Sequence, residues 1–306
     1  MDDTPIDKRL FRQALRIRLV EERVISLYPS DKIQSPVHLS IGQEAAAVGI
    51  CDVLRKTDLL FGTYRGHAYY LAKGGDLKMF FAELFGRSGG ISGGKAGSMH
   101  LAAPEVGFQG CSAVVASNIP HAVGAALAAR RLKKDQRIVT VFGDGATEEG
   151  VFHESMNFAA LHNLPVIFIC ENNGYAVHAP LAARQAFDIA GLPELYGIPY
   201  TRIDDGYDFL TVREQFAAVA DASTGPQFVE IITYRSKEHV GIADDFDAGY
   251  RARADFDGWQ SRDPLVQEAA LAEEYREAIE AEIAEAVAFA EASPWPAPDA
   301  LLTDVI

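Results

Sequence analysis

The chain has 306 residues, 48% of them hydrophobic and 23% charged, so it carries enough apolar material for a buried core. This composition argues against a disordered chain and against a fibrous repeat. Its 28 basic and 43 acidic residues give a net charge of −15. That charge repels nucleic acid and anionic membranes, and we expect neither as a partner. An anionic ligand would need a local cluster of cations or backbone N–H groups.

Cysteine usage and the N-terminus indicate where the protein works. Cys51, Cys111 and Cys170 are too widely spaced for a zinc site or a redox pair, and we expect reduced core residues. The first residues are acidic, unlike a targeting peptide, and no apolar run approaches the roughly 18 residues of a membrane helix. We therefore expect a cytoplasmic protein.

The first third of the chain is predicted to be mainly helical. Apolar residues at three- and four-residue steps predict a helix over 8–28. A second helix is expected over 42–55, a short apolar segment over 58–62 and another helix over 76–85. Residues 86–98 contain six glycines, which exclude regular structure and predict a loop.

Helices and strands then alternate. We expect helices over 120–131, 148–162 and 209–222, strands over 137–142, 165–170 and 227–234, and one further helix and strand near 185–203. The strands are continuous apolar runs, as in a parallel sheet covered on both faces by helices. The expected fold class is therefore α/β with a doubly wound, mostly parallel sheet.

The last part of the chain is predicted to lie outside this alternation. The acidic stretch 244–257 is expected to be a solvated surface loop. A final amphipathic helix carries Tyr275, Ile279, Ile283 and Val287 at four-residue steps, as a core or subunit-interface stripe. We expect one domain over 1–262 and a C-terminal helix with its tail over 263–306.

Polar side chains follow two neighbouring strands of the expected sheet. Gly143-Asp144-Gly145-Ala146 follows one strand, and Glu171-Asn172-Asn173-Gly174-Tyr175 follows the next. Ligands of open parallel sheets bind at the carboxyl ends of the strands, so Asp144 and Asn173 are expected to meet there. Carboxylate and amide oxygens suit Mg²⁺, which often also binds a substrate phosphate. A helix starting at Thr147 would direct its N–H groups to the same point.

The spacing of these groups, GDG followed by 26 residues and NN, resembles the thiamine-diphosphate fingerprint. Further motifs narrow the resemblance to the alpha subunit of thiamine-diphosphate-dependent 2-oxo acid dehydrogenases (pyruvate, branched-chain 2-oxo acid or acetoin), over about residues 10–270. They are His38-Leu-Ser-Ile-Gly-Gln-Glu-Ala45, Thr63-Tyr-Arg-Gly-His67, Gly93-Gly-Lys-Ala-Gly-Ser-Met-His100, Phe152-His-Glu-Ser-Met-Asn157 and Thr233-Tyr-Arg235.

The resemblance implies a thiamine-diphosphate-binding fold and specific ligands for the cofactor. Mg²⁺ would be bound by the side chains of Asp144 and Asn173 and by the backbone carbonyl of Tyr175. The diphosphate would receive backbone N–H groups from Gly145 and Ala146.

Other positions would bind the remainder of the cofactor. Tyr64 and Arg65 match a pair that contacts the terminal phosphate, and Ala113 to Val115 match the loop facing the aminopyrimidine. His239 matches a catalytic histidine beside the thiazolium ring, and we take His67 as a second catalytic candidate. The glycine-rich loop 86–98 is expected to shape the cofactor channel or a subunit contact.

The resemblance also implies a reaction. The enzyme would decarboxylate a 2-oxo acid, or cleave an acyloin, and pass the acyl unit to lipoamide. An alternative is a two-polypeptide carboligase or transketolase-like enzyme with an aldehyde acceptor. A non-catalytic homologue would have lost the metal residues, which are present here.

The partners follow from what the chain lacks. Thiamine chemistry needs a catalytic Glu, which the family takes from a separate beta subunit, and the chain has no room for a second α/β unit. We expect a heterotetramer of two alpha and two beta chains, with a lipoyl-bearing acyltransferase as a further candidate partner.

Overall fold

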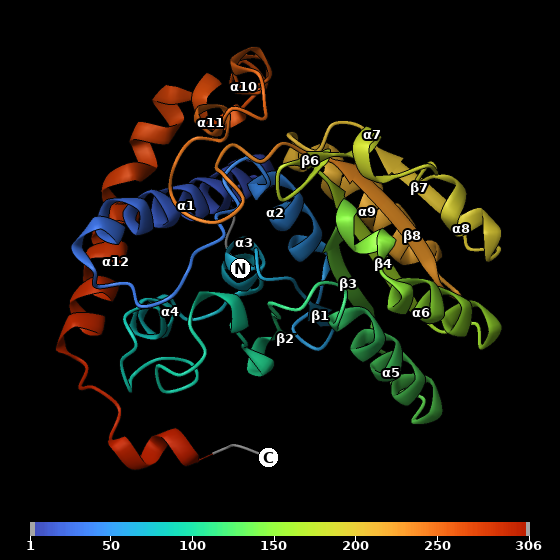
Figure 1. The fold of residues 1–306 in the computed structure, drawn as a ribbon, viewed down its shortest axis with the longest axis horizontal. Helices are drawn as coiled ribbons and strands as arrows, with labels where there is room; N and C mark the ends of the chain where they lie inside the picture. Colours follow the sequence, from blue (N-terminus) through green and yellow to red (C-terminus); the bar gives the residue numbers. More distant parts are fainter. Residues whose placement is uncertain (1–3, 304–306) are drawn as a thin grey trace.

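Six parallel strands form the central sheet of the computed structural model, which describes residues 4–303 (Figure 1). Their order is β2-β1-β3-β4-β8-β7, and every neighbouring pair is parallel. The strands are β1 (Leu59–Phe61), β2 (Phe108–Gly110), β3 (Ile138–Gly143), β4 (Val166–Asn172), β7 (Tyr200–Ile203) and β8 (Gln227–Ile232). The predicted parallel sheet is confirmed.

Alternating side chains of the strands enter two separate hydrophobic cores. In β3, Val139 and Val141 belong to one core, and Ile138 and Phe142 to the other. Successive strand residues point to opposite faces, so a strand buried on both faces is apolar throughout. The continuous apolar runs therefore report a sheet covered on both sides.

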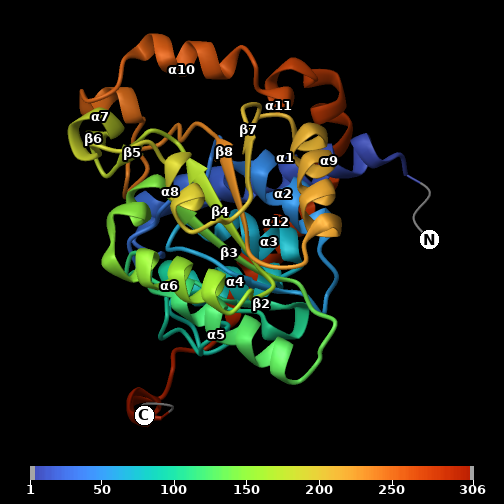
Figure 2. The same ribbon diagram turned by 90° about the vertical axis from the view of Figure 1, so that its right-hand side faces the viewer.

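Helices cover both faces of the sheet, as Figures 1 and 2 show. Three of them contribute to the core that contains Ile138: α5 (Asn118–Arg131), α6 (Gly150–Leu161) and α8 (Gly191–Leu195). The core that contains Val139 is built with α1 (Ile6–Leu27), α2 (Glu44–Val53), α3 (His67–Lys73), α4 (Leu77–Leu84), α9 (Phe209–Ala222) and α12 (Ala269–Ala292). The molecule is thus a doubly wound α/β fold.

Apart from several short 3-10 helices, the remaining elements are short and lie near the carboxyl ends of the strands or before α12. They are the hairpin β5 (Tyr175–Ala176) and β6 (Ala179–Pro180), and the helices α7 (Leu181–Arg184), α10 (Arg253–Gln260) and α11 (Pro264–Gln267). The sequence analysis did not anticipate α3 or α10.

The acidic stretch 244–257 differs from the predicted solvated loop. It contains α10, and Asp245 is fully buried. The Asp245 carboxylate pairs with Arg235 at 3.4 Å and with Arg251 at 2.8 Å. The prediction of solvated charge is wrong for Asp245, because two arginines from other segments compensate its burial.

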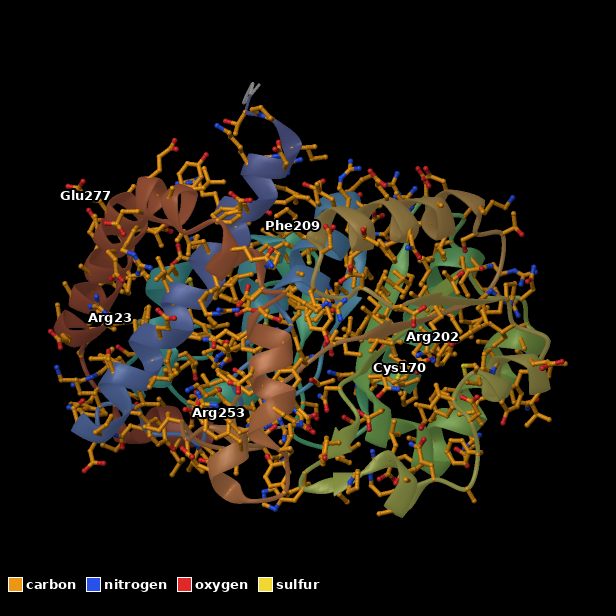
Figure 3. All side chains as sticks on the ribbon, turned by 90° about the horizontal axis from the view of Figure 1, so that it is seen from above. Arg23, Cys170, Arg202, Phe209, Arg253 and Glu277 are labelled. Carbon is orange, nitrogen blue, oxygen red and sulfur yellow. The ribbon has the colours of Figure 1, made fainter. Side chains whose placement is uncertain are left out.

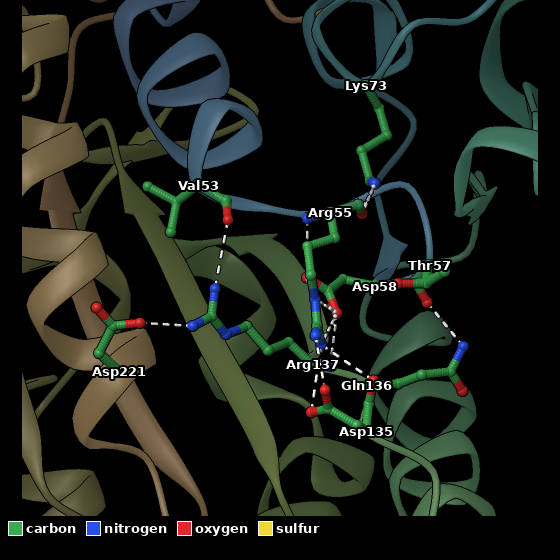
Figure 4. Close-up of polar contacts among 9 residues, drawn as sticks. All are labelled: Val53, Arg55, Thr57, Asp58, Lys73, Asp135, Gln136, Arg137 and Asp221. Carbon is green, nitrogen blue, oxygen red and sulfur yellow. Dashed lines mark hydrogen bonds and ion pairs between the residues drawn. The ribbon is translucent and has the colours of Figure 1, made fainter.

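Polar contacts fix the amino ends of β1 and β3, opposite the ends where the motif residues lie (Figure 4). Buried Asp58 accepts the backbone N–H of Arg55 at 2.8 Å and of Arg137 at 2.9 Å. Burial raises the pKa of Asp58, but hydrogen bonds from Arg55 and Arg137 outweigh it and hold the pKa below its usual value. Asp58 thereby locks the register in which Leu59 faces Ile138.

The C-terminal helix α12 packs on the core that contains Val139 through Ile279 and Ile283, as its apolar stripe predicted. Figure 3 shows Glu277 at the outer edge of this helix and Cys170 among the strands. All three cysteines are free and buried, and burial raises the pKa of each thiol. The domain division at residue 262 falls between α10 and α11 and stays a prediction.

None of the helices in the part of the chain that the structure describes is long and apolar enough to cross a membrane.

Candidate active site

A cavity of about 340 Å³ opens at the carboxyl ends of β1, β3, β4 and β8; we call it the central pocket. Its volume falls in the range of roughly 300–1,000 Å³ that is common for small-molecule sites. The loops after these strands and after β2 supply most of its lining. Among the lining residues are Tyr64, Arg65, Ala113, Val115, Asp144, Gly145, Ala146, Asn173, Tyr175 and His239. The structure thus brings together all the candidate site residues except His67.

Asp144 is placed by the end of β3. Gly143 faces Glu171 in the sheet register, so Asp144 and Asn173 lie just beyond two paired strands. The Asp144 side chain is 1% exposed. Its Oδ2 pairs with Arg184, whereas Oδ1 is buried and has no hydrogen-bond partner among the residues that the structure describes. Burial raises the pKa of Asp144, and Arg184 offsets this only in part. An unpaired buried carboxylate oxygen is a suitable ligand for a cation.

Asn173 lies in the tight turn between β4 and β5. Its Oδ1 accepts the N–H of Tyr175 at 3.2 Å, and its Nδ2 donates to Gln43 Oε1 at 3.4 Å. Arg251 donates to the Asn173 carbonyl at 2.8 Å, and its guanidinium lies 4.3 Å from the centroid of the Tyr175 ring. These contacts hold the turn against the loop that carries Arg251.

Among the described residues, no group of three or more His, Cys, Asp or Glu side chains is arranged to hold a metal ion. A metal in the central pocket would therefore depend on one carboxylate together with amide and carbonyl oxygens, a set that suits Mg²⁺.

Two buried arginines, Arg65 and Arg235, also line the pocket, and Arg235 is paired with Asp245. Arg65 donates to the carbonyls of Leu39 at 2.6 Å and His239 at 3.2 Å. Within residues 4–303 it forms no ion pair with a carboxylate. Burial, reinforced by Arg235, lowers the pKa of Arg65 to about 10. Because a buried cation without an anionic partner is costly, the pocket suits a phosphate group.

Three rings lie beside these arginines. The ring centroids of His38 and Tyr64 are 4.6 Å apart, those of His38 and His239 5.1 Å, and those of Tyr64 and His239 5.5 Å. Burial, with a contribution from Arg65, lowers the pKa of His38 to about 3 and of His239 to about 4. Both imidazoles are therefore neutral at pH 7 in the free chain, and each can accept or donate a hydrogen bond.

Sequence reasoning missed several residues at this site. His38, Glu171 and Arg235 line the pocket, and Arg184 pairs with Asp144. Glu171 and Arg235 stand at the ends of β4 and β8, so the strand-end rule that found Asp144 would have found them. Burial raises the pKa of Glu171 to about 7. No sequence signal points to Arg184, which reaches the site from the short helix α7.

His67 does not reach the central pocket. Its side chain is fully buried, with Nδ1 3.1 Å from Glu21 and Nε2 2.6 Å from Ser98. A direct catalytic role for His67 is therefore withdrawn, because both ring nitrogens are occupied and the ring is shielded from any ligand.

The glycine-rich loop 86–98 supplies no residue to the lining of the pocket. Instead it wraps around the carboxylate of buried Glu83. Oε2 accepts the N–H groups of Ser92 and Gly94, and Oε1 accepts those of Ala96 and Gly97, at 2.7 to 3.0 Å. The loop thus binds an internal anion and does not line the central pocket. The alternative role, a subunit contact, stays a prediction.

Comparison with solved structures places the fold among those of known enzymes. The chain resembles transketolase from Leishmania mexicana with a TM-score of 0.61, over 92% of this chain and 46% of that one, at 18% sequence identity. At this identity the likeness establishes a shared fold.

Sequence comparison identifies the family. The family model described as "Dehydrogenase E1 component" matches residues 12–299, and the chain belongs to this family. It is 36% identical to the alpha subunit of acetoin:2,6-dichlorophenolindophenol oxidoreductase from Bacillus subtilis, over 97% of this chain and 92% of that one. It is 38% identical to the pyruvate dehydrogenase E1 component alpha subunit from Zymomonas mobilis, over 97% of this chain and 87% of that one. The resemblance inferred from the motifs is confirmed.

Proposed function

We propose that the chain is the alpha subunit of a two-subunit enzyme that decarboxylates a 2-oxo acid, or cleaves an acyloin, with thiamine diphosphate and Mg²⁺. Family membership and the alpha subunits to which it is similar support this assignment. The observation that carries it is that one pocket contains both Asp144 Oδ1 and the Arg65 guanidinium. Within residues 4–303, the oxygen has no hydrogen-bond partner and the guanidinium has no carboxylate partner.

In this proposal the two ends of the diphosphate site have different roles. The side chains of Asp144 and Asn173 and the carbonyl of Tyr175 bind Mg²⁺, which neutralises the diphosphate. Arg65 and Tyr64 bind the terminal phosphate, where a guanidinium can donate two hydrogen bonds.

Gly145 and Ala146 supply backbone N–H groups to the diphosphate. A Cβ added to Gly145 would lie 2.7 Å from the Cβ of Ala176. The glycine therefore lets the β5 hairpin pack closely against this turn.

Thiamine diphosphate, when bound, would supply a nucleophilic carbon and a thiazolium ring that can take up the electrons left by decarboxylation. The chain itself binds and orients this group and excludes water around it. The neutral imidazole of His239 lies in the same pocket, where it would accept or donate a hydrogen bond to a group bound there. His239 is the catalytic residue proposed for this chain.

A beta subunit completes the proposed active site. The acidic residues that line the central pocket, Asp144, Glu148, Glu149 and Glu171, all follow β3 or end β4, on the side of the metal residues. None comes from the loop Ala113 to Val115, which the proposal places against the aminopyrimidine. The Glu that activates the aminopyrimidine is therefore assigned to the partner.

The rim of the pocket also suits a partner surface. Val114 is 67% exposed, and Val115, Val177 and Val240 are also exposed apolar side chains. Three of the four line the pocket mouth, where covering them would remove apolar surface from water. A heterotetramer of two alpha and two beta chains would cover this rim, and lipoamide on an acyltransferase would accept the acyl unit.

Reconstitution tests the proposed reaction. The chain, purified with its beta subunit, is supplied with thiamine diphosphate, Mg²⁺ and single 2-oxo acids or acetoin, with dichlorophenolindophenol as electron acceptor. Reduction of the dye that depends on both subunits and on one substrate supports the assignment. If product forms only when an aldehyde is added, the enzyme is a carboligase and the assignment is wrong.

Substitution of Asp144 tests the metal site. Asp144→Ala, and the isosteric Asp144→Asn, should abolish Mg²⁺-dependent cofactor binding in calorimetry while circular dichroism stays native. Asp204→Ala removes an exposed carboxylate directly after β7 and serves as the control. Unchanged cofactor affinity in Asp144→Ala would overturn the metal assignment.

A further inference from the structure

Three fully buried polar side chains form a continuous chain beside the central pocket. His67 of α3 lies between Glu21 of α1 and Ser98, with Nδ1 3.1 Å from Glu21 Oε1 and Nε2 2.6 Å from Ser98 Oγ. Glu21 also accepts the backbone N–H of Ser40 at 2.9 Å and its hydroxyl at 3.0 Å. These bonds join four segments that are distant in the sequence.

The hydrogen bonds fit one arrangement of donors and acceptors. His67 Nδ1 can donate to the Glu21 carboxylate while Nε2 accepts the hydroxyl proton of Ser98. Every buried polar atom of His67 is satisfied in this arrangement, as buried networks require.

Three of these four segments contribute a pocket residue within two positions of the network; the segment around Glu21 contributes none. The three pocket residues are His38, Arg65 and Met99. None of the side chains of the network lines the pocket. The network therefore acts on the pocket through the backbone of these segments and through the charge of Glu21, which favours the charged form of Arg65.

Neighbouring residues hold both His67 and Ser98 in place. The ring of His67 packs edge-on against Phe80, with centroids 5.0 Å apart. The N–H of Ser98 donates to Ser35 Oγ at 2.9 Å, and a Cβ on neighbouring Gly97 would lie 2.8 Å from the Cβ of Ser35. Apolar side chains of similar volume would fill this space at less cost in desolvation, but without directional bonds. The polar network therefore favours one geometry of the three segments.

We propose that Glu21, His67 and Ser98 form a positioning network that holds His38, Arg65 and Met99 in the geometry that binds thiamine diphosphate. The inference rests on the proposed function, since it assigns the network to that cofactor's site.

A graded set of variants tests the network in the complete complex with the beta subunit. His67→Phe keeps a ring against Phe80 and removes both polar links. Ser98→Ala removes one link, and His67→Asn removes the same link while keeping a donor for Glu21. We expect His67→Phe to weaken thiamine diphosphate binding by roughly tenfold or more, as for residues that orient ligands. The other two variants should show a smaller, equal loss, and turnover at saturating cofactor should stay within about twofold for all three.

Asp58→Asn is the matched control. Asp58 is also buried and polar but lies at the opposite ends of the strands, so its variant should lower the melting temperature and leave cofactor affinity unchanged. A His67→Phe variant that behaves like Asp58→Asn would overturn the proposal and leave only a structural role. Absence of cofactor binding by the wild-type complex would instead refute the proposed function.

Hydrogen exchange gives a readout that needs no cofactor. In Ser98→Ala and His67→Phe, amides of residues 38–40, 63–66 and 97–99 should exchange faster together, with α6 unchanged. Faster exchange confined to the mutated segment would contradict the network whatever the cofactor result.

Discussion

Replacing Arg65 with glutamine should weaken cofactor binding strongly while changing the stability of the free chain to a smaller extent. Burial and the neighbouring Arg235 lower the pKa of Arg65 to about 10. A shift of this size means that the charged side chain costs the free protein on the order of 3 kcal/mol. Glutamine removes this cost, but its shorter side chain also loses the hydrogen bonds to the carbonyls of Leu39 and His239, worth about 1.5 to 3 kcal/mol each. The two effects oppose each other, so the free energy of unfolding should fall by no more than about 3 kcal/mol.

Cofactor binding has no such compensation. A guanidinium that donates two charge-assisted hydrogen bonds to a phosphate contributes about 3 to 6 kcal/mol, at about 1.5 to 3 kcal/mol each. The dissociation constant of thiamine diphosphate should therefore rise about 100-fold to 10,000-fold in Arg65→Gln.

The assay combines two measurements. Calorimetry of the complex with the beta subunit gives cofactor affinity, and urea unfolding of the chain gives its stability. Arg16→Gln, which removes a surface pair with Glu282, is the control and should change neither quantity appreciably. Native-like affinity in Arg65→Gln, or a loss of stability large enough to account for weaker binding, would refute the reasoning.

Three further predictions concern the pocket and the loop behind it. Gly145→Ala should weaken cofactor binding in calorimetry with the fold retained, because its Cβ would lie 2.7 Å from the Cβ of Ala176. A cofactor affinity equal to that of the wild type would contradict the need for glycine beside the β5 hairpin. Glu83→Gln should destabilise the chain by about 2 to 4 kcal/mol in urea unfolding, since an amide cannot accept four N–H groups; an unchanged midpoint would contradict the role of the loop. Burial, reinforced by Arg65, lowers the pKa of His38 from 6.5 to about 3. As pH falls, the unfolded chain therefore takes up this proton before the folded chain does, and the stability of the free chain should fall as pH drops from about 6.5 towards 3. His38→Asn should make the stability less dependent on pH in this range. A variant with the same pH profile as the wild type would contradict the role of His38.

Local pattern predicted the sheet well. The strands β3 and β4 are apolar on both faces, so hydrophobicity alone located them to within two residues. Their order along the chain then placed Asp144 and Asn173 at one edge, because parallel strands end on the same side.

Side-chain contacts between segments that are distant in the sequence could not be predicted from local pattern. Asp245 appeared in an acidic run typical of a solvated loop, but it is buried because Arg235 and Arg251 compensate its charge. His67 stands beside Arg65 in the sequence and was taken as a site residue. Its ring instead turns towards Glu21 on α1, 46 positions away. Charge compensation of this kind depends on the tertiary fold, which neither periodicity nor residue type reports.

The most direct test of a divided active site is calorimetric titration of thiamine diphosphate and Mg²⁺ into the chain alone and into its mixture with the beta subunit. The account predicts binding that appears or tightens only in the mixture, together with turnover of a 2-oxo acid. Full binding and turnover by the chain alone would show that this chain supplies the activating carboxylate itself, and would contradict the two-subunit mechanism.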